Sequence, residues 1–368
     1  MSTAWPEVLG ALVSGTDLTP DQAAWAMEQV LSGAATPAQV SGFAIGLRSK
    51  GETATEVAAL AEVMLAHARL APVTAGPTLD VVGTGGDQLH TVNISTMASL
   101  VCAAAGAPIV KHGNRAASSS TGTADVLEEL GVAIDLEPGL VAECVADAGI
   151  GFCFAPTHHP AMRHAGPSRR ELGIPTVFNI LGPLTNPGQA ASALIGCASL
   201  AWAPIMAAVL ARRGVRALIV RGDDGLDEVS TCSVTRVWDA RGPEVVQTTV
   251  DAADWGIARA TVSDLRGGDS ARNAALLRKA LGQCRPDDPD ASQVARIRDA
   301  VALNAAAALV AFDCARGEAD AQPGAIPLAD AIAARLARTQ EIVRTGAAEG
   351  VLDRWIAVST ALAGAGQA

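Results

Sequence analysis

The chain lacks two features that would place it in or across a membrane. It has no uninterrupted apolar run near the roughly eighteen residues at which a segment becomes a candidate membrane span. Its start, MSTAWPEVLG, has no basic stretch followed by an apolar core, as a secretory signal would. These absences predict a cytoplasmic protein with no membrane partner. The composition, with 49% hydrophobic and 18% charged residues, is that of a globular protein rather than a disordered one.

Cysteines at metal-binding or redox spacing are missing too. The seven cysteines include no C-x-x-C pair, and their number is odd. We therefore expect reduced, buried cysteines that act as small apolar residues, not disulfides or zinc ligands.

Positive charge is scarce, because 27 Lys and Arg face 38 Asp and Glu, for a net charge of −11. A nucleic-acid partner is disfavoured, since binding to a phosphate backbone normally needs a basic face. An anionic small molecule would have to be met by local charges and metal, because the overall field repels it. Lysine is rarest, with Lys50, Lys111 and Lys279 alone in the chain, so a lysine at the end of a strand is notable.

Residues 79–130 contain two loops of the same design, and the rest of the chain is organised around them. Each loop leaves a short apolar strand (79–82, then 108–110), passes through small and polar residues, and ends at a helix start (95–106, then 123–130). Such a loop gathers free backbone N–H groups at the positive end of a helix, which suits a phosphate.

The first loop is glycine-rich, with the sequence GTGGD at residues 83–87. It is not a dinucleotide-binding fingerprint, because the third glycine would fall at Gln88, and the chain contains no Walker A pattern. The N-I-S-T run at residues 93–96 places an amide and two hydroxyls at a helix mouth. Taken alone, this run more often caps the helix than holds a phosphate or a metal, and both roles stay open here.

The second loop begins KHGNR at residues 111–115 and continues through small hydroxyl residues to Thr123. A cationic start followed by short donors suits a polyanionic ligand, since the cations meet the phosphates and the hydroxyls meet the oxygens between them.

Seven motifs occur together in order: GTGGD, T-x-NIST, KHGNR-x-x-SS, HPAM, R-x-ELG, FN-x-LGPLTNP and GLDE. Their order and spacing over essentially the full chain resemble the anthranilate phosphoribosyltransferase family. The resemblance implies transfer of the 5-phosphoribosyl group from 5-phosphoribosyl 1-diphosphate to the amine of anthranilate. The products would be N-(5-phosphoribosyl)anthranilate and diphosphate, in the second step of L-tryptophan biosynthesis from chorismate.

The same resemblance implies an α/β fold class with two domains. A small N-terminal helical domain would cover residues 1–75, completed by a returning segment near residues 169–190. A larger α/β phosphoribosyl-binding domain would cover residues 76–368, with a mostly parallel central sheet flanked by helices. The family also implies a homodimer formed through the helical domain.

The residues themselves agree with this architecture. Thr19, Thr36 and Thr53 stand where helix N-caps belong, and residues 74–77 read as a linker. Further along, short apolar runs alternate with helical patterns, as expected of strands joined by helical crossovers. The runs predicted as strands beyond the two loops are residues 131–136, 150–156, 191–199, 215–222, 235–240 and 244–250.

The resemblance also carries site residues onto this sequence. The phosphoribosyl diphosphate would contact Gly83, Gly86, Asp87, Thr91, Asn93, Ile94, Ser95, Thr96, Lys111, Ser118, Ser119 and Thr123. Anthranilate would contact Gly83, His112, Asn114, Pro156 and Arg169, where the arginine fork suits a carboxylate. Ser95, Asp227 and Glu228 would hold Mg²⁺, two ions per active site.

Adjacent carboxylates on a turn, such as Asp227 and Glu228, are often just a solvated bend, but they can also bind one hard cation together. Loss of diphosphate builds charge on both fragments, so we expect Mg²⁺, Lys111 and loop amides to stabilise the leaving group. No side chain is assigned as a general base, and removal of the amine proton is left to the substrate carboxylate or to water.

Three other interpretations remain. A pyrimidine nucleoside phosphorylase-like enzyme would share the fold class, but KHGNR and the R-x-ELG arginine disfavour it. A non-catalytic, nucleic-acid-binding relative would need a basic groove, which the charge disfavours. The histidines at 158, 159 and 164 could suggest zinc, but no nearby Cys, Asp or Glu completes a set, so we predict a pocket-lining loop instead.

Overall fold

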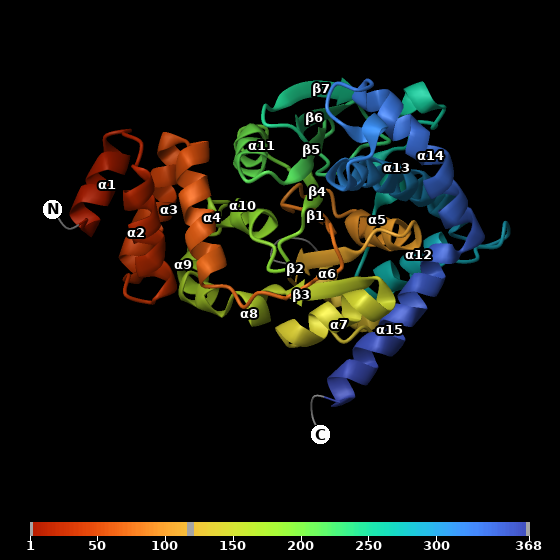
Figure 1. The fold of residues 1–368 in the computed structure, drawn as a ribbon, viewed down its shortest axis with the longest axis horizontal. Coiled ribbons are helices and arrows are strands. Elements are labelled where there is room, and N and C mark those ends of the chain that lie inside the picture. Colours follow the sequence, from red (N-terminus) through yellow and green to blue (C-terminus); the bar gives the residue numbers. More distant parts are fainter. Residues whose placement is uncertain (1–2, 116–120, 366–368) are drawn as a thin grey trace.

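The computed structural model describes residues 3–115 and 121–365 of the chain. It has a helical part built from the N-terminal segment and a larger part built around a sheet (Figure 1). In Figure 1 the helical part lies at the left and the sheet runs through the right-hand part.

The helical part begins with α1 (Trp5–Val13), α2 (Pro20–Leu31), α3 (Pro37–Lys50) and α4 (Ala54–Ala66). The predicted N-caps Thr19, Thr36 and Thr53 are confirmed. Each threonine side chain accepts from the backbone N–H three residues later, and the Gln or Glu at that position bonds back to the cap. These reciprocal hydrogen bonds, known as capping boxes, fix where α2, α3 and α4 begin.

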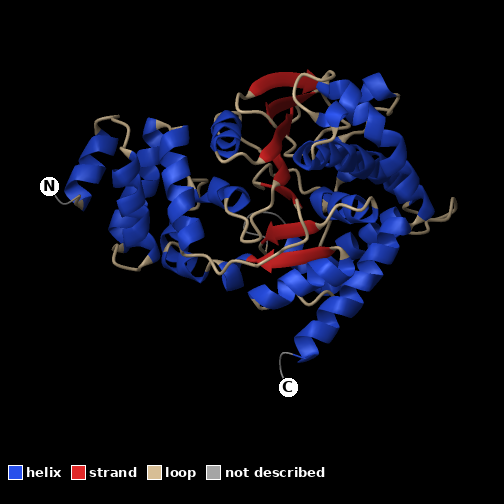
Figure 2. Cartoon of the chain, viewed as in Figure 1, coloured by secondary structure: helices blue, strands red, loops and turns tan. Residues whose placement is uncertain are grey.

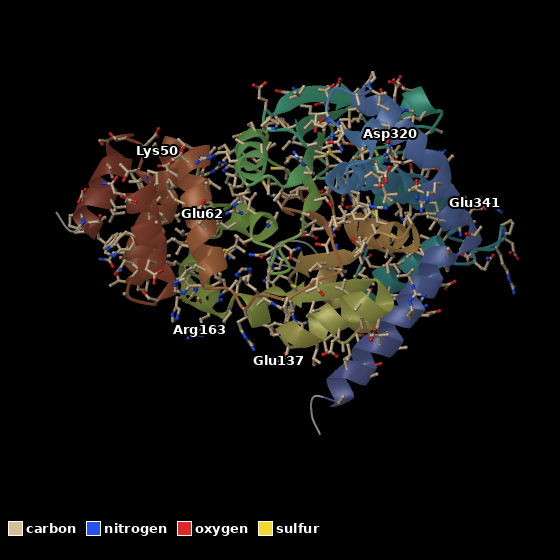
Figure 3. The ribbon with its side chains drawn as sticks, viewed as in Figure 1. Lys50, Glu62, Glu137, Arg163, Asp320 and Glu341 are labelled. Atoms are coloured by element: carbon tan, nitrogen blue, oxygen red, sulfur yellow. The ribbon has the colours of Figure 1, made fainter. Side chains whose placement is uncertain are left out.

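A later segment returns to the helical part through α8 (Ala155–His158), η1 (Pro160–His164), α9 (Gly166–Leu172) and α10 (Phe178–Leu184). Helix α9 packs against α3, and α10 packs against α4. Glu62 lies on the side of α4 that faces the sheet-containing part (Figure 3), where its charge acts on Arg213.

The larger part contains a sheet of seven strands among the described residues, in the order β3-β2-β1-β4-β5-β6-β7 (Figure 2). The first five pair in parallel, whereas β6 and β7 are antiparallel additions at one edge. The strands are β1 (Leu79–Gly83), β2 (Ile109–Gly113), β3 (Ile150–Phe154), β4 (Ser192–Gly196), β5 (Arg216–Gly222), β6 (Thr235–Ala240) and β7 (Val246–Val250). The predicted fold class is therefore confirmed.

Two apolar cores flank the sheet. Leu79 and Val81 of β1 belong to one core, whereas Ala193 and Ile195 of β4 belong to the other, which continues into the helical part. The helices are α5 (Ile94–Ala104), α6 (Thr123–Glu129), α7 (Pro138–Ala148), α11 (Ala203–Arg212), α12 (Ser270–Leu281), α13 (Ala291–Arg316), α14 (Leu328–Thr345) and α15 (Ala347–Ala365), with short turns η2 (Ala252–Trp255), η3 (Val262–Leu265) and η4 (Ala319–Ala321). Within the described ranges, none of the helices has the length and apolarity to cross a membrane.

One strand prediction was wrong. Residues 131–136 alternate apolar and other residues as a half-buried strand would, but they form no strand in the structure. Val132, Ile134 and Leu136 are buried in the core, so the alternation reflects burial of one side. The backbone N–H of Ala133 bonds the Ser359 hydroxyl of α15 at 3.1 Å, which shows that this segment packs against a helix and pairs with no neighbouring strand.

Candidate functional site

A cleft with a volume of about 810 Å³ opens where the parallel strands end and the helical part begins. Its walls include the ends of β1 and β2, the loop after β3, and Met64 of α4 and Phe178 of α10. Ligands in parallel α/β sheets generally bind at the carboxyl ends of strands. The two predicted phosphate loops therefore meet in one place, facing a wall from the other part of the molecule.

The first loop holds an unusual backbone shape. Gly85 and Gly86 have φ angles of +64° and +82°, and Gln88 and His90 also have positive φ. Glycine adopts this region without strain, whereas Gln and His do not, so the loop is held in place by its surroundings. An isolated pairing of Thr91 with Arg266 fastens the end of this loop.

Asn93 precedes α5 directly but makes no side-chain capping bond to that helix. Its Oδ1 instead accepts from Nδ2 of Asn273 at 3.0 Å, and Asn93 lines the cleft. Capping alone therefore does not explain the asparagine of N-I-S-T.

The carboxylates of Asp227 and Glu228 lie at the same end of the cleft and are tied to the first loop. Asp227 Oδ2 accepts from the Gly85 N–H at 2.8 Å, and the backbone of Ser95 favours the ionised form of Glu228, lowering its pKa. Burial, followed by the negative charge of Asp87, raises the pKa of Asp227 well above its ordinary range. Burial and then the charge of Asp227 raise the pKa of Glu228 well above its ordinary range.

Buried acids that repel one another suit a bound cation, because a metal ion replaces the missing counter-charge. The described residues contain no group of three His, Cys, Asp or Glu side chains that could hold a metal by themselves. A donor set of two carboxylates fits Mg²⁺, which keeps water and substrate oxygens as its other ligands. The residues present therefore fit Mg²⁺ better than a structural zinc.

Gly196 ends β4 and makes the approach of Asp227 possible. A Cβ atom at this position would lie 1.5 Å from the Asp227 carbonyl oxygen, which is a backbone atom that cannot move aside. The glycine thus allows the turn that carries Asp227 and Glu228 to pack directly on the strand ends. No motif at Gly196 indicated this role.

Lys111 does not line the cleft but lies buried beside β1, with 1% of its surface exposed. Its Nζ donates to the Val81 carbonyl at 2.5 Å and to Ser99 Oγ at 3.2 Å. Burial lowers the pKa of Lys111, and attraction to Asp80 and Glu228 acts in the opposite direction. Because Lys111 does not line the cleft, its direct contact with a diphosphate stays a prediction.

Arg169 lines the other side of the cleft, with its guanidinium 5.9 Å from the ring centre of Phe178. Burial lowers its pKa, and no acid among the described residues offsets that effect. A desolvated guanidinium without an anion favours a carboxylate ligand.

His112 stands nearby as a neutral side chain. Its Nδ1 lies 3.0 Å from the Gly182 carbonyl, which can only accept, so Nδ1 carries the proton and Nε2 is an acceptor. Burial, followed by the neighbouring His159 ring at 5.1 Å, lowers the pKa of His112 to about 3. At neutral pH this ring can position a donor but is too weak a base to take up a proton.

The histidine-containing loop lines the pocket, as predicted. Pro156, His159, Pro160 and Met162 all face the cleft. His158 is instead buried, with Nδ1 2.7 Å from the Arg69 carbonyl. This contact ties the loop to the end of the helical part.

Most of the predicted substrate residues meet in the cleft. Those that line it are Gly83, Gly86, Asp87, Thr91, Asn93, Ile94, Ser95, His112, Asn114, Thr123, Pro156, Arg169, Asp227 and Glu228. Thr96, like Lys111, is buried and does not line it. Ser118 and Ser119 lie outside the described residues.

Sequence reasoning missed several lining residues. Phe178 and Asn179 of α10 and His90 of the first loop face the cleft. Arg163 of η1 also lines it, and Figure 3 places this arginine at the lower edge of the helical part. A signal was available only for Phe178 and Asn179, which belong to the FN-x-LGPLTNP motif. His90 and Arg163 belong to no motif quoted above, and only the tertiary fold places them at the cleft.

Two family models match the chain. Residues 6–68 match the model described as glycosyl transferase family, helical bundle domain. Residues 75–348 match the one described as glycosyl transferase family, a/b domain.

Curated relatives are similar over nearly their whole length. A protein of Nocardioides sp. named anthranilate phosphoribosyltransferase is 54% identical, covering 98% of this chain and 99% of the relative. One of the same name from Arthrobacter sp. is 52% identical, covering 96% of each.

Solved structures of anthranilate phosphoribosyltransferases are also similar to this chain over nearly its whole length. The anthranilate phosphoribosyltransferase of Thermus thermophilus superposes with a TM-score of 0.82 at 37% identity, covering 96% of this chain and 99% of that chain. The Saccharomyces cerevisiae enzyme in complex with PRPP and Mg gives 0.81 at 27% identity, covering 97% and 98%. The yeast enzyme in complex with 4-fluoroanthranilate gives 0.79 at 26% identity, covering 97% and 99%.

Proposed function

This chain belongs to the anthranilate phosphoribosyltransferase family, and we propose that its cleft moves the 5-phosphoribosyl group of 5-phosphoribosyl 1-diphosphate (PRPP) onto the amine of anthranilate. The products are N-(5-phosphoribosyl)anthranilate and diphosphate, in the second step of L-tryptophan biosynthesis. The protein is a magnesium-dependent pentosyltransferase. The observation that carries the proposal is one cleft with a buried acid pair beside the two loops at one end and, at the other, a buried arginine whose charge no acid of the described residues offsets.

The donor PRPP occupies the end formed by the two loops. Backbone N–H groups of residues 83–87 and the N-terminal end of α5 face its phosphates, and Asn93 and Thr123 supply side-chain donors from the two loops. Ser95 holds one Mg²⁺, and Asp227 with Glu228 holds a second. When bound there, the metal supplies positive charge that stabilises the departing diphosphate.

Anthranilate lies between the donor and the wall facing the helical part. Arg169 binds its carboxylate, and Asn114, His112 and Pro156 hold the ring and orient the amine. The Nε2 acceptor of His112 is buried without a partner among the described residues, so it is available to a hydrogen from the amine.

The reaction is a displacement at the ribose C1 carbon. The amine nitrogen forms a bond to C1 as the bond to the diphosphate oxygen breaks, with inversion at that carbon. The amine proton passes to the neighbouring anthranilate carboxylate or to water, because His112 has a pKa of about 3. The protein contributes position and electrostatic stabilisation, and Lys111 adds positive charge from beneath the site.

We extend the proposal to assembly and location. The helical domain, residues 1–75 with the returning segment near 169–190, would form a homodimer, and the α/β domain, residues 76–368, would bind PRPP. Trp5 and Trp25 of the helical part are only partly buried and contact each other edge to face, which supports such a contact surface. Light scattering coupled to size exclusion measures the dimer. A cytoplasmic location is part of the same proposal.

The direct test is loss of anthranilate fluorescence when the purified protein is mixed with anthranilate, PRPP and Mg²⁺. We expect turnover that stops on addition of EDTA and returns with excess Mg²⁺. Phosphorolysis of a pyrimidine nucleoside without turnover of anthranilate would favour a phosphorylase. A folded protein that does neither, and binds nucleic acid, would refute the enzyme assignment.

A further inference from the structure

Asn273 connects a segment without any assigned role to the phosphate loops. It lies in the first turn of α12, is 2% exposed, and does not line the cleft. Its Oδ1 accepts from the Gly268 N–H at 2.8 Å, and its Nδ2 donates to Asn93 Oδ1 at 3.0 Å. The side chain therefore bridges a turn on one side and a cleft residue on the other.

These two bonds determine which way the Asn93 amide faces. A backbone N–H can only donate, so the Asn273 atom beside Gly268 must be the oxygen, and the atom beside Asn93 must be the NH₂. That NH₂ can only donate, so Asn93 must present its oxygen to it. The remaining NH₂ of Asn93 is then the group available to the cleft, and an NH₂ donates to an anion whereas a carbonyl oxygen repels one.

The same turn touches both phosphate loops. The Gly267 N–H donates to the His90 carbonyl at 2.8 Å in the first loop, and the Thr121 hydroxyl donates to the Gly268 carbonyl at 2.9 Å at the end of the second. A Cβ atom on Gly267 would lie 2.5 Å from Asn273 Oδ1, so the turn and the asparagine fit together only with glycine here. These two hydrogen bonds connect the turn to both loops.

We propose that Asn273 is a positioning residue for the phosphorylated substrate: it orients the Asn93 amide toward an anionic oxygen and fixes the turn that spaces the two loops. The inference rests on the function proposed above, because it assigns Asn93 to PRPP. It predicts that Asn273 affects binding of PRPP and leaves the anthranilate end of the cleft unchanged.

The helix itself does not depend on this asparagine. Asp269 caps α12 by accepting from the Arg272 N–H at 2.8 Å, and the Arg272 guanidinium pairs with Asp290 at 2.6 Å. The substitution Asn273→Asp keeps the size of the side chain and the bond from Gly268, but removes the donor to Asn93. Arg272→Gln is the matched control, because it breaks an ion pair on the same helix without touching either loop.

The experiment measures KM for each substrate and direct binding of PRPP with Mg²⁺ by calorimetry. A lost hydrogen bond in a site for a charged ligand costs roughly a factor of ten to a hundred. For Asn273→Asp we expect the KM for PRPP to rise by roughly tenfold or more, with the KM for anthranilate, measured at saturating PRPP, changed less than about twofold. Arg272→Gln should match the wild type in both constants.

A double-variant cycle separates positioning from general destabilisation. If Asn273 acts through Asn93, Asn93→Ala with Asn273→Asp should bind PRPP no more weakly than Asn93→Ala alone. Gly267→Ala places a methyl group against Asn273 Oδ1 and should therefore weaken PRPP binding in the same selective way. This variant provides the test if Asn273→Asp does not fold.

The outcomes are distinguishable. Wild-type turnover with an unchanged KM for PRPP in both Asn273→Asp and Gly267→Ala, or additive losses in the cycle, would overturn the inference alone. A wild-type protein that neither binds PRPP nor consumes anthranilate would refute the proposed function, and the inference with it.

Discussion

The two ends of the cleft are built in different ways. The PRPP end uses the ends of adjacent parallel strands, where backbone N–H groups and the carboxylates of Asp227 and Glu228 converge. The anthranilate end is assembled from single side chains, such as Arg169 of α9 and His112 of β2, that come from separate elements. One end is therefore fixed by the sheet, whereas the other depends on how the returning segment meets the sheet.

The electrostatics differ in the same way. At the proposed PRPP end, Asp227 and Glu228 are buried together with raised pKa values, as suits a cation-binding pair, and the buried Lys111 attracts Glu228. At the anthranilate end, Arg169 carries one desolvated positive charge. If the proposed function is right, one end of the cavity depends on metal and the other does not, and variants should separate them.

The largest effect is expected from removing the acid pair. The double variant Asp227→Asn with Glu228→Gln should lower kcat/KM for PRPP by at least about a thousandfold, because the charge stabilisation by a bound metal is worth several kcal/mol. Calorimetric binding of anthranilate should change little. The measurement is turnover as a function of Mg²⁺, and wild-type activity of the double variant at ordinary Mg²⁺ would contradict the assignment.

Arg169→Ala should show the reverse selectivity. We expect the KM for anthranilate to rise by roughly tenfold to a hundredfold, since a charge-assisted hydrogen bond to a carboxylate is lost. The KM for PRPP should rise far less, as measured by varying each substrate at saturation of the other.

Arg170→Ala is the matched control for that variant, because Arg170 is the next residue on α9 and also lies along the cleft but is exposed. It should affect anthranilate binding much less. Equal increases of both KM values in Arg169→Ala would refute the carboxylate role.

A variant of His112 tests the effect of this residue on stability separately from its effect on catalysis. Its pKa is lowered from 6.5 to about 3 by burial, so the unfolded chain takes up a proton below pH 6.5 that the folded chain does not. Its contribution to stability is fully present above pH 6.5 and is lost as the pH falls toward 3. Between pH 7.5 and 5.0 the wild type should lose about 2 kcal/mol more unfolding free energy than His112→Gln, measured by urea denaturation at both values.

The pH–rate profile is the second measurement on this variant. Since His112 stays neutral from pH 5 upward, the shape of the profile between pH 5 and 9 should be the same in His112→Gln, although the rate falls. A limb of the profile that disappears in the variant would make His112 a general base instead.

The comparison also explains what the sequence could predict. The segments that form the proposed PRPP end could be recognised because each is contiguous: GTGGD, NIST and KHGNR each lie at a strand-to-helix turn, and GLDE follows a strand. The direction of the strands could not be predicted in the same way. Its two additions, β6 and β7, are antiparallel, and nothing in their apolar runs distinguishes that direction.

Three further features depend on tertiary packing and could not be predicted from the sequence. Residues 131–136 alternate as a strand would, but α15 covers them. Asn273 follows a glycine pair that also reads as an ordinary turn before a helix, so only its contacts with Gly268 and Asn93 reveal its position. The burial of Lys111 could not be predicted either, because a lysine that ends a strand and begins a polar loop is normally expected to be accessible.

The smallest effect is expected at Thr123, at the start of α6, and it tests whether the PRPP end needs a side-chain hydroxyl from the second loop. Thr123→Ser keeps the hydroxyl and should change the KM for PRPP by less than about twofold, whereas Thr123→Val keeps the shape and should raise it by roughly tenfold, the cost of one hydrogen bond to a charged group. Thr123 lines the cleft and lies close to Gly113 at the end of β2, so its branched side chain can also contribute by packing. A Ser variant as impaired as the Val variant would mean that this packing, and not the hydroxyl, sets the contribution of Thr123.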